Sequence, residues 1–152
     1  MTELEQAEAA APAKSAMPLL RAVSVSRTFG RGEGAVHALK GADLSVYPGQ
    51  LIALKGRSGS GKTTLLNILA ALDMPTEGQV YYGERSLGSM SERERDRLRR
   101  KDIGLIFQSF ALVPYMSAYE NVEFGLRISG VDRDKRRRLA EQALEFVGLK
   151  QR

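Results

Sequence analysis

Residues Gly56 to Thr63 read GRSGSGKT and match the pattern G-x-x-x-x-G-K-[ST] at every fixed position. Glycine lets the backbone of such a loop bring its amide N–H groups close to phosphate oxygens. The pattern's lysine, Lys62, reaches the β- and γ-phosphates, and its hydroxyl residue, Thr63, is a ligand for magnesium. The pattern therefore predicts a site for a nucleoside triphosphate, namely ATP with Mg²⁺. The residues expected to bind the nucleotide here are Gly56, Arg57, Ser58, Gly59, Ser60, Gly61, Lys62, Thr63 and Thr64.

A phosphate-binding loop follows a buried strand and opens a helix, and the segments on either side of this loop fit those two elements. Leu51 to Lys55 is a short apolar run, which predicts a buried strand. Thr63 to Leu72 has the pattern of a helix with a wide buried face, formed by Leu65, Leu66, Ile68 and Leu69. A loop that opens a helix faces the positive end of the helix dipole, which favours a bound anion. A glycine- and serine-rich linker that matches by accident would lack both flanks.

The chain before the loop predicts a tail followed by a β-rich part. Met1 to Pro18 is rich in Ala, Glu and Pro and poor in large apolar side chains, so we expect a disordered tail, with a frayed helix as the alternative. The folded part is expected to begin near Leu19. The alternation in Leu20 to Phe29 predicts a strand. A second strand is expected from Ala42 to Tyr47, where the turn dipeptide Pro48-Gly49 ends it.

The chain after the loop contains two capping boxes, which predict the starts of two helices. Ser91 is followed three residues later by Glu94, and Ser117 by Glu120. In each box the serine side chain and the glutamate side chain satisfy backbone N–H groups that a helix start leaves unpaired. The elements expected are a strand over Gly78 to Tyr82, a helix over Ser91 to Arg100, a core strand over Ile103 to Phe107, a helix from Ser117 to near Gly130, and a helix over Asp132 to Val147 with Leu139, Ala143, Leu144 and Val147 on one face and Gly148 as its stop.

Composition excludes several kinds of site. The 152 residues include no cysteine and one histidine, His37, so disulfides, thiolate metal sites and histidine-based metal clusters are excluded. The formal net charge is +5, and positive charge gathers in Arg93 to Lys101 and Arg133 to Arg138. Because both runs are mixed with Asp or Glu, we interpret them as solvated helix faces, with a nucleic-acid or acidic-membrane surface as the alternative. The sequence shows neither a membrane span nor a secretory signal, so we expect a cytoplasmic protein.

Several longer stretches resemble one family of P-loop ATPases. Val36 to Leu66 reads VHALKGADLSVYPGQLIALKGRSGSGKTTLL, and the likeness continues in LDMPTEG (Leu72 to Gly78), IFQSF (Ile106 to Phe110) and SAYENV (Ser117 to Val122). These stretches are similar to the nucleotide-binding domain of ABC (ATP-binding cassette) transporters, in the branch serving lipoprotein release, macrolide export and cell division. The resemblance spans about Leu19 to Arg152. It implies an α/β P-loop NTPase fold of ABC type, with an N-terminal β-rich subdomain, a P-loop strand–helix core and the start of a helical subdomain.

The resemblance also implies roles for residues at matching positions. Phe29 matches an aromatic residue that stacks on adenine, with a core phenylalanine at a strand end as the alternative. Val36 matches an apolar residue that packs near the base. Gln108 matches the Q-loop glutamine, which reaches magnesium and the attacking water and senses the membrane subunits. The implied catalytic residues are therefore Lys62 and Gln108, and the implied metal ligands are Thr63 and Gln108.

The resemblance also implies binding partners and a location in the cell. ABC ATPases bind the transmembrane permease subunits of a transporter and pair head to tail with a second ATPase subunit. The resemblance thus implies a cytoplasmic protein that is peripheral on the inner face of the cell membrane, without a nucleic-acid partner. The complete protein would couple ATP binding and hydrolysis to export or lipoprotein release across or from the membrane.

Three elements of the family pattern are not found in the chain. There is no LSGGQ signature, no apolar strand ending in Asp-Glu follows the Q-loop, and His37 precedes the P-loop and cannot be the switch histidine. We therefore expect the N-terminal part of a longer ATPase, which binds nucleotide but lacks the hydrolytic residues. A short nucleotide sensor is the alternative to a longer protein. A DNA-associated ATPase of the same superfamily and a non-catalytic binding fragment are the alternative functions.

Overall fold

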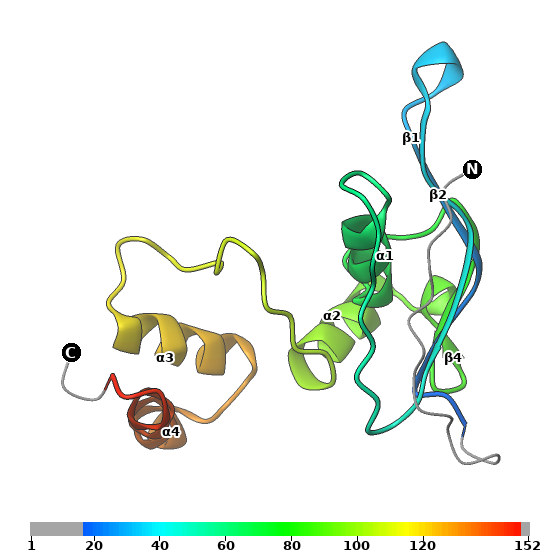
Figure 1. Cartoon of the computed structure of the whole chain (residues 1–152). Coiled ribbons are helices and arrows are strands. Elements are labelled where there is room, and N and C mark those ends of the chain that lie inside the picture. The colour runs from blue at the N-terminus through cyan, green and yellow to red at the C-terminus, as the bar shows by residue number, and fades with distance from the viewer. Residues whose placement is uncertain (1–16, 150–152) are drawn as a thin grey trace. The chain divides into compact units, whose positions relative to one another are not determined.

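The computed structural model describes residues 17–149. Residues 1–16, which make up most of the expected disordered tail, lie outside the described residues, as do residues 150–152. The chain divides into two compact units, one ending at Arg95 and one beginning at Asp96. All the strands and the first helix belong to the first unit, the last two helices belong to the second, and helix α2 (Glu92–Lys101) contains the boundary between them (Figure 1).

The first unit contains a four-stranded antiparallel sheet in the order β2-β1-β3-β4 (Figure 1). Its strands are β1 (Leu20–Phe29), β2 (Val36–Val46), β3 (Glu77–Tyr82) and β4 (Arg85–Ser86). The short 3₁₀ turn η1 (Gly32–Gly34) lies between β1 and β2. The strands predicted over Leu20 to Phe29 and Gly78 to Tyr82 are confirmed, and the second strand begins at Val36 rather than at Ala42.

The core of the first unit includes one face of helix α1 (Lys62–Leu69), which packs against β1 and β2. Leu65, Ile68 and Leu69 are at most 6% exposed, because they recur on one side of the helix. The sheet contributes the buried side chains of Ala22, Val25, Leu39 and Val80. Leu66 is 51% exposed, so the buried face is narrower than the sequence predicts. The sheet covers only one side of the helix, and Leu66 lies outside that side.

Two apolar runs that we expect to be buried strands have no strand structure. In Leu51 to Lys55, only Leu54 forms an isolated bridge, and Leu51 is 95% exposed. In Ile103 to Phe107, no residue is in a strand and Ile106 is 99% exposed. A strand is stable when a neighbour pairs with its N–H and C=O groups. Among residues 17–149 no neighbouring strand pairs along either run, so both predictions are wrong for that reason.

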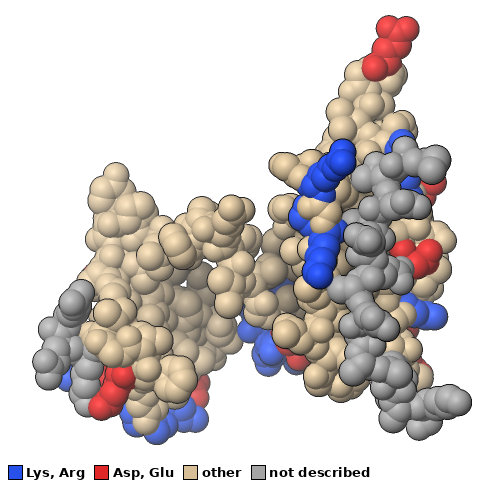
Figure 2. Space-filling model, in the orientation of Figure 1, with Lys and Arg blue, Asp and Glu red and all other residues tan. Residues whose placement is uncertain are grey.

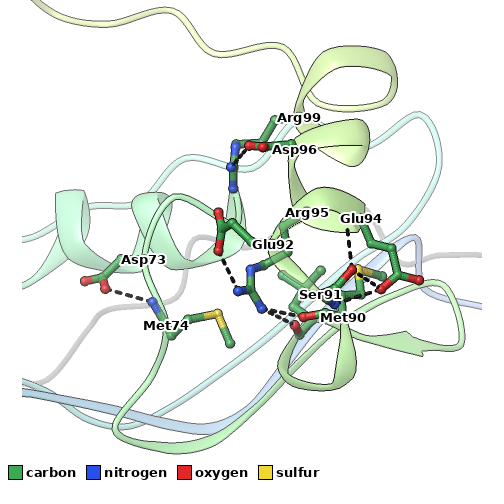
Figure 3. A network of polar contacts seen from close by, with 10 residues as sticks. Asp73, Met74, Met90, Ser91, Glu92, Glu94, Arg95, Asp96 and Arg99 are labelled. Atoms are coloured by element: carbon green, nitrogen blue, oxygen red, sulfur yellow. Dashed lines mark hydrogen bonds and ion pairs between the residues drawn. The ribbon is translucent and has the colours of Figure 1, made fainter.

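Helix α2 (Glu92–Lys101) begins with the predicted capping box. The N–H and the hydroxyl of Ser91 both donate to the Glu94 carboxylate at 2.7 Å, and the Glu94 N–H donates to the Ser91 hydroxyl at 3.4 Å. Arg95 donates to the Met90 carbonyl and to the Glu92 carboxylate, each at 2.6 Å (Figure 3). These bonds tie the first turn of α2 to the segment that leaves the 3₁₀ turn η2 (Leu87–Ser89).

The second unit contains the helices α3 (Ala118–Ile128) and α4 (Arg133–Phe146), which pack against each other. Helix α3 opens with the predicted capping box: Ser117 Oγ accepts from the Glu120 N–H at 3.2 Å, and the Glu120 carboxylate accepts from the Ser117 N–H at 2.7 Å. An ion pair between Arg136 Nη1 and Glu123 Oε1, 2.8 Å apart, joins the two helices. Both predicted helices are confirmed.

The buried face of α4 differs from the predicted one, which comprised Leu139, Ala143, Leu144 and Val147. Ala140 is fully buried and Leu144 is 9% exposed, whereas Val147 is 62% exposed. Arg136, Ala140 and Leu144 recur every four residues and therefore share one side of the helix. Because Arg136 is paired with Glu123 of α3, this side faces α3 and the predicted face is turned partly away.

Candidate nucleotide-binding site

The predicted phosphate-binding loop leads directly into α1. The Ser60 N–H donates to the Arg57 carbonyl at 3.2 Å, which makes the loop turn tightly. Gly59 and Gly61 have φ angles of +78° and +89°, in the left-handed region that favours glycine. Gly61 is also the capping residue of α1 and has no side chain with which to cap it. The N–H groups of the first helical turn are therefore left for an external acceptor, and an anion suits them well.

The Lys62 ammonium folds back over this loop. Its Nζ donates to the carbonyl oxygens of Gly56 and Arg57, each at 2.8 Å, and to Ser60 Oγ at 3.3 Å. An ammonium group has three N–H donors, so these contacts engage all of them. They hold one full positive charge within the loop that is predicted to bind phosphates.

Positive charge also dominates the chain around the loop. Residues 44–72 contain no Asp or Glu but contain Lys55, Arg57 and Lys62. On the face drawn in Figure 2, Lys and Arg atoms gather over the segment that leads into α1. A surface dominated by one sign of charge raises the local concentration of the opposite charge. This surface therefore favours an anionic ligand, and the exposed Thr63 and half-buried Thr64 border it along the chain.

The two residues predicted to contact the base lie opposite each other at the end of the β1–β2 hairpin. Phe29 and Val36 are Cα partners across the pair of strands, and their exposed fractions are 42% and 62%. Such exposure does not fit the alternative of a core phenylalanine. Two residues further along β2, Ala38 lies directly against Gly61. The hairpin end that carries both residues is thus next to the phosphate-binding loop.

Arg27 is a residue of this site that sequence reasoning did not single out. Its guanidinium carbon lies 4.6 Å from the centre of the Phe29 ring, and its Nη2 donates to Asp73 Oδ1 at 2.8 Å. Asp73 lies 46 residues later in the chain, so no local pattern links the pair. The only signal in the sequence is the alternation of β1, which puts Arg27 and Phe29 two residues apart on one face of the strand.

Gln108 belongs to the second unit, where it lies exposed in a turn over residues 108–111. Two residues of this turn, Phe110 and Ala111, have φ angles of +62° and +51°, a region that residues other than glycine rarely adopt. Since the P-loop belongs to the first unit, the structure describes Gln108 only within its own surroundings. The backbone after Gln108 is strained, as it often is at functional segments.

Asn121 fixes the segment that follows this turn, and sequence reasoning did not single it out either. Its Oδ1 accepts from the Val113 N–H at 2.8 Å, and its Nδ2 donates to the carbonyls of Met116 and Ser117, each at 3.0 Å. One amide side chain thereby closes residues 113–117 onto α3. The residue lies within the SAYENV stretch, but no local rule predicts these partners.

Metal-binding clusters and membrane-spanning helices are both missing from residues 17–149. No group of three or more His, Cys, Asp or Glu side chains could hold a metal ion there. None of the helices in that range combines the length and the apolar character needed to cross a bilayer. A magnesium ion at the P-loop would rely on a hydroxyl, water and the phosphates of a nucleotide, which is the way Mg²⁺ is commonly bound.

A comparison with known families decides where the chain belongs. Residues 39–152 match the family model described as "ABC transporter". The chain belongs to the ABC transporter family. This membership confirms the resemblance that the sequence stretches around the P-loop and the Q-loop indicate.

Curated relatives of this ABC chain include members of the expected branch. An uncharacterized ABC transporter ATP-binding protein of Methanocaldococcus jannaschii is 46% identical over 131 residues, which are 86% of this chain and 58% of the relative. The macrolide export ATP-binding/permease protein MacB of Marinobacter nauticus is 44% identical over 138 residues (91% and 21%). The lipoprotein-releasing system ATP-binding protein LolD of Xanthomonas campestris pv. campestris is 40% identical over 131 residues (86% and 55%). The resemblance to a branch that includes macrolide export and lipoprotein release is therefore confirmed.

A solved ABC cassette has the same fold. The dimeric structure of a post-hydrolysis state of the cassette MJ0796, bound to ADP and Pi, matches with a TM-score of 0.70 and 34% identity. The match covers 87% of this chain and 58% of that cassette, so the chain spans little more than half of it. The expected α/β fold of ABC type is confirmed, and the antiparallel sheet corresponds to the expected β-rich part. The exception is the strand expected before the P-loop, which the structure lacks.

Proposed function

We propose that this chain is the ATP-binding part of an ABC transporter, and that residues 56–64 hold the phosphates of ATP. The observation that carries the proposal is the Lys62 ammonium, which lies on the carbonyl oxygens of Gly56 and Arg57 inside the loop. A triphosphate that enters the loop competes for the same donors with full negative charge. Phosphate oxygens carry full negative charge whereas the carbonyl oxygens are neutral dipoles, so Coulomb attraction to the ammonium favours the exchange. The uncapped N–H groups at the start of α1 favour the same anion.

The proposal assigns the base to Phe29 and Val36 at the hairpin end. The Phe29 ring is large, apolar and 42% exposed, which suits a stacking platform. Base–aromatic stacking contributes about 1–3 kcal/mol in other proteins. Val36, directly across the strand pair, adds apolar surface beside the ring.

The residues present also fit a magnesium ion that is bound together with the nucleotide. Thr63 carries a hydroxyl in the first turn of α1 and directly follows Lys62 in the chain. Because no acidic cluster for a metal occurs among residues 17–149, we assign the remaining ligands to the phosphates, to water and to Gln108. When bound, magnesium neutralises charge that develops on the phosphates.

For the whole protein we propose coupling of ATP binding and hydrolysis to export or lipoprotein release. The relatives named for macrolide export and lipoprotein release support this assignment. The partners are then transmembrane permease subunits and a second ATPase subunit, at the inner face of the cell membrane. We assign residues 1–18 to a tail and 19–152 to the N-terminal part of the ATPase domain, with the hydrolytic residues supplied outside this chain.

The DNA-associated alternative has less support. Many basic side chains of the two charged runs are paired with acidic neighbours rather than gathered on a free surface. The pairs are Arg95–Glu92, Arg99–Asp96, Lys135–Asp132, Arg136–Glu123 and Arg137–Glu141. Paired charges contribute little to counterion release, which drives most binding to nucleic-acid backbones.

A binding measurement tests the phosphate site. The ATP affinity of the chain is measured by calorimetry for the parent, for Lys62→Ala and for Lys101→Ala, which removes the same charge from an exposed position in α2. Lys62→Ala removes a charge-assisted contact worth about 1.5–3 kcal/mol, so ATP binding should become undetectable, whereas Lys101→Ala should bind like the parent. Equal ATP affinity in the parent and in a folded Lys62→Ala variant would contradict the proposal.

A further inference from the structure

We propose that Arg27 is a positioning residue for nucleotide binding, which holds the Phe29 ring so that only one of its faces is offered to the base. This inference rests on the proposed function, because it takes Phe29 as the stacking platform. The guanidinium carbon of Arg27 lies 4.6 Å from the centre of the ring, on one of its two faces. A cation in that place is attracted by the ring and keeps that face from any other partner.

The position of Arg27 is in turn set by Asp73. Nη2 of Arg27 donates to Asp73 Oδ1 at 2.8 Å, and the two side chains are only 24% and 29% exposed. The same carboxylate oxygen accepts from the Met74 N–H at 2.8 Å, which orients it (Figure 3). A partly buried ion pair is screened less by water and salt than an exposed one. The guanidinium is therefore held between a carboxylate and an aromatic ring. Its Nε has no acceptor among residues 17–149.

Asp73 also connects this arrangement to the helix that begins at the P-loop. The N–H groups of Leu72 and Asp73 both donate to the carbonyl of Asn67 in α1, at 2.9 and 3.2 Å. The C-terminal end of α1 thus places Asp73, whereas its N-terminal end carries Lys62. The phosphate-binding loop therefore lies at the N-terminal end of α1. Asp73, which positions the base platform through Arg27, lies just beyond the C-terminal end of the same helix.

Further hydrogen bonds join the segment after α1 to the strand that carries Phe29. The Thr76 N–H donates to the Ser26 carbonyl at 2.8 Å, and the Thr28 N–H donates to Thr76 Oγ1 at 3.0 Å. These bonds lie on either side of Arg27 in β1. They hold the backbone on both sides of Arg27 beside the segment that follows α1, so Arg27 and Asp73 lie close together before a nucleotide binds. Such preorganisation lowers the cost of ordering the site on binding.

The test uses two ligands to distinguish effects on binding of the base from effects on binding of the phosphates, because ATP has a base and tripolyphosphate has none. Affinities for Mg·ATP and for inorganic tripolyphosphate with Mg²⁺ are measured on the chain by equilibrium dialysis. The variants are Arg27→Met, Phe29→Ala and the double variant. Arg21→Met is the matched control, because Arg21 lies over the Tyr81 ring at 4.5 Å on the same strand and away from Phe29 in sequence. Circular dichroism establishes that each variant is folded.

Arg27→Met should lower ATP affinity by about 3- to 10-fold and leave tripolyphosphate affinity unchanged, since a cation–π contact orients only the base platform. Phe29→Ala should lower ATP affinity by about 5- to 150-fold, and adding Arg27→Met to it should change nothing more. Arg27→Lys, which keeps a cation near Asp73 and the ring, should restore most of the ATP affinity. Asp73→Asn keeps the acceptor for Met74 and should cause a smaller loss that is again confined to ATP.

Three results would overturn the inference while leaving the proposed function intact. In the first, Arg27→Met binds ATP like the parent. In the second, Arg27→Met lowers the affinities for ATP and for tripolyphosphate equally. In the third, Arg27→Met lowers the ATP affinity further in the Phe29→Ala background. If Arg27→Met does not fold, the inference is tested by the affinities of Arg27→Lys and Asp73→Asn for Mg·ATP and for tripolyphosphate. A parent chain that binds neither ligand contradicts the proposed function itself, and the inference fails with it.

Discussion

Gly61 packs so closely against Ala38 that a β-carbon built on Gly61 would lie 2.3 Å from the Ala38 carbonyl oxygen. The same atom would lie 2.8 Å from Cδ2 of Leu39. Glycine is therefore required at this position both for space and for its φ angle of +89°. The contact joins the last glycine of the P-loop to β2, so the shape of the loop depends on the sheet.

Gly61→Ala is expected to destabilise the fold and to weaken ATP binding together. The left-handed conformation costs a residue with a β-carbon about 1–2 kcal/mol, and the clash with backbone adds about 1–3 kcal/mol. Gly41→Ala is the matched control, because Gly41 has a φ angle of +66° but open space around the built β-carbon. Urea unfolding should show a larger loss for Gly61→Ala than for Gly41→Ala. Equal losses would mean that the contact with Ala38 has no effect on stability.

The start of α3 should lose stability in acid. The backbone N–H of Ser117 and then its hydroxyl hold the pKa of the Glu120 carboxyl below its ordinary value of about 4.3. A lowered pKa in the folded state means that this stabilisation is complete above the ordinary value and is lost as the pH falls through the lowered one. Hydrogen exchange of the amides in the first turn of α3 should therefore accelerate over that range.

Two variants separate this effect from general acid unfolding. In Glu120→Gln the side chain does not titrate, so the acid-dependent change at the start of α3 should disappear. In Ser117→Ala the hydroxyl is lost, and the pKa of Glu120, followed by NMR titration of its carboxyl group, should rise. A Glu120 pKa that is the same in the parent and in Ser117→Ala would contradict this account.

Gln108→Ala should reduce ATP turnover more than ATP binding. The proposal places Gln108 at magnesium and the attacking water, and loss of a group that stabilises or orients the reacting atoms lowers rates by about 10- to 1,000-fold. The measurement is phosphate release and ATP affinity in a polypeptide that spans the full length of the relatives. Gln142→Ala, an exposed glutamine of α4, is the control and should behave like the parent. A Gln108→Ala variant with full turnover would remove this residue from the mechanism.

The chain of 152 residues, purified alone, should release no phosphate from Mg·ATP above the level of its Lys62→Ala variant. Hydrolysis needs a group that orients the attacking water. Among the acidic residues after Gln108, Glu120 accepts from Ser117, Glu123 is paired with Arg136, and Glu141 is paired with Arg137. Turnover at the rates of ordinary ATPases would show that a base lies within these residues.

The sequence by itself determined the parts of this protein that depend on neighbouring residues. The P-loop pattern predicts the tight turn and the helix that follows it, because the glycines and the helix start lie within eight residues of each other. The capping box of Ser117 and Glu120 is present as predicted for the same reason: donors and acceptors are three residues apart. The strand β1 was predictable from alternation, which reflects one covered face.

Only the tertiary structure decided what depends on distant partners. The run from Leu51 to Lys55 has the composition of a buried strand, but a strand forms only where another strand pairs with it, and composition does not say whether one does. The side of α4 that faces α3 follows from the pair of Arg136 and Glu123, thirteen residues apart. The contact of Arg27 with Asp73 spans 46 residues and exists because the sheet and the end of α1 meet in space, which no local pattern in the chain encodes.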